Sequence, residues 1–310
     1  MGDKGKSHYP IVGGAALLVL AAALRGIGTL AVKEAVNTCG FAAAVGLRFA
    51  LAVLLLAGAS SRHLARGLSP TVVLHGVALG VISAGVFLLN HAGLAFVSPS
   101  QSSFLTSTYC VAVPFVAWAF ARVRPRASLM AAAIVAVVGV WLLFEGAEGS
   151  GFTWGATLSL LGAGLFAIQV VATGVMADAR NAIALSAVQM ATVGVVGLGI
   201  ALLQDGAGIM RMVGALDTWG LMGFVAVFST LAPLLCQNMG QRFVPPSLAS
   251  ILLSTEAVFC VIASATLGIE SLRGMSYVGF ACIFASVAIA LVGSARGAGD
   301  ASVSSGEEAS

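Results

Sequence analysis

Long hydrophobic runs separated by short polar or charged breaks dominate this sequence. A helix that crosses the hydrocarbon core of a bilayer needs about 20 apolar residues, with a range of roughly 17 to 25. The runs are continuous rather than alternating, which favours helices over the strands of a membrane barrel. The pattern predicts ten spans, at 11–32, 39–59, 71–93, 99–121, 127–144, 154–176, 181–203, 217–241, 247–269 and 273–294. Short breaks between them predict antiparallel neighbours and an all-α integral membrane fold with no sizeable soluble domain.

Composition supports this assignment and excludes several classes of protein. Of the 310 residues, 59% are hydrophobic and 9% are charged, whereas an average soluble domain has roughly 25% charged residues. A soluble enzyme and a disordered scaffold are therefore excluded. The net charge of +3 comes without a basic cluster, so we expect no nucleic-acid partner. The five cysteines and four histidines are scattered, and we expect no metal site and no cofactor.

The distribution of lysine and arginine predicts the orientation of the chain. Most of these residues fall on the side of the amino terminus, and basic loops stay in the cytoplasm. We therefore expect a cytoplasmic segment at 1–10 and a disordered cytoplasmic tail at 295–310. The expected location is the plasma membrane or bacterial inner membrane, with the protein as a monomer or homodimer.

An internal repeat divides the chain into two halves. The segments Phe96–Ser103 and Phe243–Ser250 share the frame F-V-x-P-S-x-x-S, and each follows a span that carries side-chain amides. This match predicts two five-span repeats, at about 11–145 and 152–294. Because five is odd, the second repeat must be inverted relative to the first. Inverted repeats are a recurrent basis of alternating-access transport, in which a central site opens to one side of the membrane at a time.

Three ionisable residues lie inside predicted spans, namely Arg25, Arg48 and Glu256. Each costs at least about 2.5–3.5 kcal/mol at bilayer depth and therefore needs a partner or a wet cavity. One interpretation is a structural Arg48–Glu256 ion pair that closes the bundle. The other is a central cavity in which Glu256 binds a proton, a cation or a substrate amine. Two arginines against one glutamate leave an excess positive charge, so Arg25 or Arg48 is a candidate for binding an anionic group of the substrate.

Neutral polar residues in the spans form a second group of candidates. They are Asn90, His91, Tyr109, Gln237 and Asn238. Such side chains can serve as hydrogen-bonding glue between helices or can line a cavity. His91 is a candidate proton carrier, and it is equally well explained as a polar residue at the outer end of its span.

Several characteristic residues and short segments lie along both halves of the chain, namely Lys33, Arg48-Phe49, Asn90, Leu94, Phe96–Ser103, Pro114, Gln241–Ser247, Ser254–Phe259 and Leu267–Glu270. In these residues the chain resembles the EamA-type transporters of the drug/metabolite transporter superfamily. The resemblance covers nearly the whole chain and implies two inverted five-helix repeats that carry small metabolites. Arg25-Gly26 stands where the family usually has Trp-Gly, and His91 stands where an aromatic residue commonly follows the asparagine. A specific substrate is therefore not implied.

These observations favour a secondary-active transporter that exports amino-acid-like or carboxylate-bearing metabolites, with a proton or a counter-substrate as the coupling partner. An importer or exchanger of the same fold is one alternative. An intramembrane enzyme acting on a lipid or membrane substrate is another, but no familiar catalytic motif is present. A passive channel would call for oligomeric symmetry rather than a doubled single chain.

Overall fold

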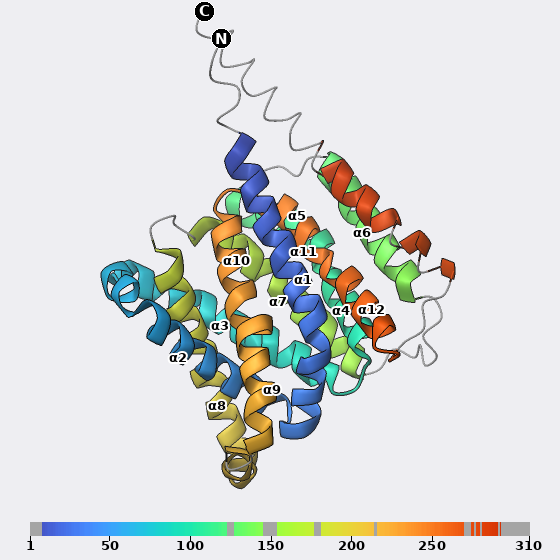
Figure 1. Ribbon diagram of the computed structural model, residues 1–310. Helices are drawn as coiled ribbons and strands as arrows, with labels where there is room; N and C mark the ends of the chain where they lie inside the picture. The colour runs from blue at the N-terminus through green and yellow to red at the C-terminus, as the bar shows by residue number, and fades with distance from the viewer. Residues whose placement is uncertain are drawn as a thin grey trace, which may run out of the picture.

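The computed structural model describes residues 8–122, 127–144, 154–176, 181–213 and 216–269 and, near the C-terminus, residues 274–275, 277–279, 281–290 and 292. Within these ranges all regular secondary structure is helical (Figure 1), which confirms the all-α fold class. The tail at 295–310, most of the predicted 1–10 segment and the junction between the predicted repeats lie outside the described residues.

Eight helical segments are long and apolar enough to cross a membrane. They are Ile11–Cys39, Phe41–Ser61, Pro70–Leu94, Pro99–Phe120, Trp154–Met176, Ala182–Gln204, Thr218–Gln241 and Pro246–Thr266. The predicted spans at 127–144 and 273–294 correspond to two shorter apolar helices, Ala127–Gly139 and Tyr277–Ala290. These two pack on each other through Gly139 and Cys282, at the edge of the molecule (Figure 1). An integral membrane protein is therefore indicated, but a count of ten full-length spans is not confirmed.

The helices have the following bounds: α1 His8–Cys39, α2 Phe41–Gly67, α3 Pro70–Leu94, α4 Pro99–Ser107, α5 Tyr109–Ala121, α6 Ala127–Phe144, α7 Trp154–Met176, α8 Ala182–Val213, α9 Leu216–Ala226, the π-helical turn η1 Val227–Leu231, α10 Ala232–Gln241, α11 Pro246–Ser254 and α12 Glu256–Thr266.

Helix α1 continues well beyond its predicted end at residue 32. The charge of Lys33 does not stop the helix, because its Nζ donates hydrogen bonds to the carbonyl oxygens of Leu94, Ala95 and Val97. The last carbonyls of a helix have no partner inside that helix, so a cation from elsewhere satisfies them. Lys33 thereby joins the C-terminal part of α1 to the end of α3.

The predicted spans 99–121 and 247–269 are each broken in the middle by a Ser-Thr pair. The first break separates α4 from α5 at Thr108, and the second separates α11 from α12 at Thr255. At each break the threonine hydroxyl donates to the carbonyl three residues earlier, at 2.7 Å. Hydroxyl groups that hydrogen-bond to the preceding turn bend helices. The same local chemistry therefore produces both breaks.

Equivalent contacts recur in the two halves of the chain. Gly14 of α1 faces Gly240, Phe243 and Val244, and Gly155 of α7 faces Gly93, Phe96 and Val97. Each partner of Gly14 lies 147 residues after the corresponding partner of Gly155, and the same spacing separates Ser107 from Ser254. These two serines are in contact, because the Ser107 Oγ donates a hydrogen bond to the Ser254 carbonyl oxygen. The repeat inferred from the F-V-x-P-S-x-x-S frame is thus present in the packing.

Helices α2 and α8 pack closely and run in opposite directions. Gly46 lies against Gly197 and Leu198, while Ala50, one turn further along α2, lies against Gly194, one turn back along α8. A Cβ atom at Gly46 would lie within 3 Å of the α8 backbone, so glycine permits this close approach.

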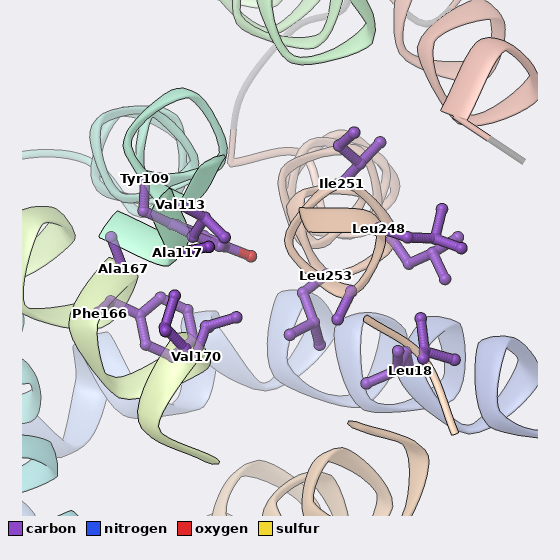
Figure 2. Packing of buried hydrophobic residues seen from close by; sticks show 14 of the residues in the cluster. Leu18, Tyr109, Val113, Ala117, Phe166, Ala167, Val170, Leu248, Ile251 and Leu253 are labelled. Carbon is purple, nitrogen blue, oxygen red and sulfur yellow. The ribbon is translucent and has the colours of Figure 1, made fainter. Parts of the chain in front are cut away.

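The largest apolar core joins α1, α5, α7 and α11. Leu18, Tyr109, Phe166 and Leu253 belong to it and are shown together in Figure 2. The core includes Tyr109, the first residue after the break between α4 and α5, and Leu253, which lies two residues before Thr255 at the break between α11 and α12.

Candidate functional site

A cavity lies between α1, α2, α3, α4 and the second repeat. Its lining consists of Arg25, Thr29, Val32, Arg48, Val86, Phe87, Asn90, His91, Leu94, Ser102, Ser103, Thr106, Phe166, Ser229 and Glu256. The lining extends along α1 from Arg25 to Val32 and along α3 from Val86 to Leu94, toward the C-terminal ends of both helices. The N-terminal half of α1 is packed instead, with Gly14 against Gly240 and Leu18 in the core.

Glu256 forms its ion pair with Arg25, not with Arg48. The Arg25 Nε lies 3.0 Å from the Glu256 Oε2, and the two side chains are 10% and 16% exposed. The interpretation of Arg48 and Glu256 as a structural ion pair, one of the two that the sequence left open, is therefore wrong. Its basis was the depth of each residue along its own span, whereas pairing depends on which face of each helix meets its neighbour.

Gly26 explains why Arg25 reaches Glu256. A Cβ atom at this position would clash with the Glu256 carbonyl oxygen and with the Cβ of Phe259. Only glycine lets α1 and α12 approach so closely at this point. The close contact brings the side chain of the preceding residue, Arg25, beside the carboxylate of Glu256, the first residue of α12.

An amide network behind the ion pair fixes Arg25. Its NH1 donates to the Gln237 Oε1 at 2.9 Å, and the Gln237 Nε2 donates to Gln169 and Gln241, each at 3.1 Å. The Arg25 guanidinium also lies 4.8 Å from the centroid of the Phe166 ring. Gln237 is fully buried and is not part of the cavity lining. Its hydrogen bonds give it the geometry of a residue that positions Arg25.

Arg48 has a very different environment from Arg25. It is 2% exposed, and its guanidinium lies 5.0 Å from the Phe49 ring centroid and 5.1 Å from that of Phe87. Its Nε has no hydrogen-bond partner, and no ion pair to Arg48 occurs in the described part of the chain. Aromatic faces attract a cation but offer no lone pair to a guanidinium donor. Arg48 is thus a buried, permanently charged group that faces the cavity without a carboxylate.

Other polar atoms in the cavity wall also lack hydrogen-bond partners among the residues that the structure describes. They are both ring nitrogens of His91 and the hydroxyl oxygens of Ser103 and Ser229. Buried polar groups are nearly always hydrogen-bonded, and those that are not need an explanation. Their convergence on the cavity that Arg48 faces is what a binding site for a polar ligand requires.

Ser229 reaches the cavity from η1. Pro233 has no N–H to donate to the Ser229 carbonyl four residues earlier, and the helix widens to a π-turn there. Gly28 of α1 accommodates the serine, since a Cβ on Gly28 would overlap the Ser229 Oγ. Turns of this kind occur often at functional sites.

The remaining predicted site residues divide between the cavity and the core. Asn90 lines the cavity and accepts a hydrogen bond from Thr106 at 3.4 Å. Tyr109 is buried in the core against Phe166, and its hydroxyl donates to the Ser250 carbonyl at 3.3 Å. Asn238 is buried away from the cavity and donates to Ser186 and Gln189.

Comparison with known proteins identifies the family. The sequence model of the EamA-like transporter family matches residues 12–145 and again residues 153–292. The chain belongs to this family. The two matches agree with the two sets of equivalent contacts described above.

The wider comparisons agree on the fold. A crystal structure titled only as that of a protein superposes on this EamA transporter with a TM-score of 0.72, covering 91% of this chain and 98% of its own. The two sequences are 18% identical, so the likeness concerns the fold alone. No curated protein sequence matches.

Sequence reasoning missed several lining residues of this EamA transporter. They are Thr29, Ser102, Ser103, Thr106, Phe87, Phe166 and Ser229. Ser102 and Ser103 belong to the repeated frame, and their position at the start of a span after proline was the available signal. Among the described residues, no cluster of three His, Cys, Asp or Glu side chains could hold a metal ion.

Proposed function

We propose that this EamA protein is a secondary-active exporter of small organic anions, above all carboxylate-bearing and amino-acid-like metabolites. Arg48 binds the anionic group of the substrate in the central cavity. The protein lies in the plasma membrane or bacterial inner membrane with both termini in the cytoplasm. The single observation that carries the proposal is the buried Arg48 guanidinium, which faces the cavity without a carboxylate partner.

The charge balance of the cavity supports an anionic ligand. Among the lining residues that the structure describes, only Arg25, Arg48 and Glu256 carry a formal charge when histidine is counted as neutral. Arg25 and Glu256 neutralise each other at 3.0 Å. An unpaired buried charge is strongly unfavourable, so the remaining positive charge favours a monovalent anion. A carboxylate fits the planar guanidinium particularly well.

The unpartnered groups around Arg48 support recognition of a polar ligand. The Ser103 and Ser229 hydroxyls can each donate to or accept from a substrate, and the His91 ring can do either depending on its tautomer. Phe87 and Phe166 add aromatic surface to the same cavity. A compact molecule with one carboxylate and further polar groups would satisfy these atoms together.

The Arg25–Glu256 pair is the second charged element of the proposed site. Glu256 is a candidate for binding a substrate amine or a coupling proton, because it lines the cavity at the point where α12 begins. A substrate ammonium group beside Arg25 would donate a hydrogen bond to the same carboxylate. Asn90 and His91 belong to the same proposed site, whereas Gln237 acts through Arg25.

Alternating access follows if the two repeats are inverted. The opposite directions of α2 and α8, the second helices of their repeats, support this relationship. Residues of both repeats line the cavity. The broken helices α4–α5 and α11–α12 contact each other beside it through Ser107 and Ser254. Broken helices at the interface of inverted repeats are a frequent location for transporter substrate sites.

Transport in proteoliposomes tests the proposal. Vesicles that contain purified protein are loaded with a mixture of ¹⁴C-labelled pyruvate, L-glutamate, D-gluconate and shikimate, and release into medium containing the same unlabelled acids is measured. We expect protein-dependent release that Arg48→Gln reduces about a hundredfold, because loss of a buried charge partner costs on the order of 3 kcal/mol. Arg48→Lys retains part of the activity.

The matched control is Arg122→Gln, which removes the same charge from an exposed residue outside the cavity. This variant transports like the wild type. Wild-type rates in Arg48→Gln would contradict the anion site.

A further inference from the structure

We propose that this transporter is an anion exchanger: its cavity changes access only while an anion is bound at Arg48, so an anion must return for each one exported. This inference rests on the anion site proposed above. It concerns the empty transporter, whose properties determine whether substrate can move without a counter-ion.

Arg48 is the residue that makes the empty state costly. With 2% of its surface exposed and its guanidinium beside the rings of Phe49 and Phe87, it has little access to water. The water that remains must come through the cavity. Closing the cavity to change its access removes that water from the guanidinium and leaves a charge in a medium of low dielectric constant.

The described part of the cavity lining has no spare carboxylate to compensate Arg48. Glu256 is the only acidic residue among the described lining residues, and Arg25 already binds it. If Glu256 turned to Arg48, Arg25 would become the uncompensated charge in its place. Either arrangement leaves one positive charge among the described lining residues.

The Arg25 side chain is also poorly placed to leave Glu256. It donates to Gln237, which is held in turn by Gln169 and Gln241, and it stacks over Phe166. These contacts fix the ion pair as a neutral unit. The excess positive charge therefore stays at Arg48 and is neutralised only by a mobile anion.

A bound monovalent anion makes the lining neutral and allows closure. The same condition applies on both sides of the membrane, because Arg48 keeps its charge throughout the cycle. Outward movement of a substrate anion must therefore be followed by inward movement of another anion. Removing one partner of a buried ion pair is strongly destabilising, so return of the empty form should be on the order of a hundredfold slower.

Release from loaded proteoliposomes into two media tests exchange. The vesicles contain the wild-type protein and the ¹⁴C-labelled mixture of pyruvate, L-glutamate, D-gluconate and shikimate. One medium contains the same four acids without label, and the other contains the bulky sulfonate HEPES as its only anion. Potassium with valinomycin on both sides removes any electrical limit on net flux, and protein-free vesicles provide the background.

We expect release into the four acids to be at least about tenfold faster than release into HEPES. Arg122→Gln should preserve that ratio. Equal, protein-dependent release into both media would overturn exchange while leaving the proposed transport function intact. Absence of protein-dependent release in both media would instead overturn the proposed function and the exchange inference with it.

Discussion

The guanidinium of Arg25 lies 4.8 Å from the ring centroid of Phe166, the residue that occupies the equivalent position in the second repeat. Arg25 follows Gly14 at the same distance along the chain as Phe166 follows Gly155, and these two glycines make equivalent contacts. The first residues after the two helix breaks, Tyr109 and Glu256, are equivalent as well.

The two repeats therefore use one geometry for two kinds of chemistry. In one place Arg25 and Glu256 form an ion pair at 3.0 Å, and in the equivalent place Phe166 and Tyr109 form an aromatic pair with centroids 4.5 Å apart. The ion pair faces the cavity, whereas Tyr109 is buried in the core. Of these two equivalent pairs, only Arg25 and Glu256 place charged groups at the cavity.

The ion pair should be detectable as an energetic coupling. We expect Glu256→Gln to lower the free energy of unfolding by about 3 kcal/mol, because it leaves Arg25 buried without its partner. Arg25→Gln should have a similar effect. The double variant should be more stable than the sum of the two changes, by about 1–3 kcal/mol. Unfolding of the three variants in SDS measures this, and simple additivity would show that the pair contributes no coupling.

The equivalent residue Tyr109 should behave differently from Glu256. Tyr109→Phe removes only the hydroxyl that donates to the Ser250 carbonyl at 3.3 Å, which costs about 1 kcal/mol. Because Tyr109 does not line the cavity, release of the labelled acids should remain within about twofold of wild type. The same proteoliposome assay checks this. A large loss of transport in Tyr109→Phe would show that the aromatic pair takes part in the substrate site.

The sequence predicted the helices well because hydropathy reports membrane-spanning segments directly. It failed at the two helix breaks for the same reason. Mostly apolar segments lie on both sides of the Ser107-Thr108 and Ser254-Thr255 pairs, so a hydropathy average over a window of span length does not detect a break made by two hydroxyl groups. The repeated Ser-Thr pair in the sequence was the local signal.

Contacts between segments that are distant in the sequence could not be predicted from each span considered separately. Depth along a span suggested that Arg48 and Glu256 lie at similar levels, but it carried no information on which helix faces which. The partner of Glu256 is decided by the close approach at Gly26. For the same reason Lys33 was interpreted as the end of a helix. The carbonyl oxygens of Leu94 and Val97, which accept hydrogen bonds from its Nζ, are near Lys33 only in the folded protein.

Gly26 should be essential for the contact between α1 and α12. We expect Gly26→Ala to destabilise the protein by about 1–3 kcal/mol, since the added methyl group would overlap the Glu256 carbonyl oxygen. Gly199→Ala is the matched control, because no atom lies within 4 Å of a Cβ at that position. Thermal unfolding in detergent should give a lower Tm for Gly26→Ala and an unchanged or higher Tm for Gly199→Ala. Equal effects of the two substitutions would mean that the helices can separate without cost.

Lys33 should hold the end of α3 in place. Its ammonium group donates to the carbonyls of Leu94, Ala95 and Val97, and hydrogen bonds from a charged donor each contribute about 1.5–3 kcal/mol. In Lys33→Gln the terminal carbonyls of α3 lose this partner, so the last turn of α3 should open more often. Hydrogen exchange of peptides covering residues 90–99 should become at least about tenfold faster. Glu34→Gln changes the charge of the neighbouring exposed residue and should leave this exchange rate unaltered. If both variants exchanged at the wild-type rate, the α3 terminus would be held by its own packing against Gly155 and Ser159, and Lys33 would not be needed to keep α1 and α3 together.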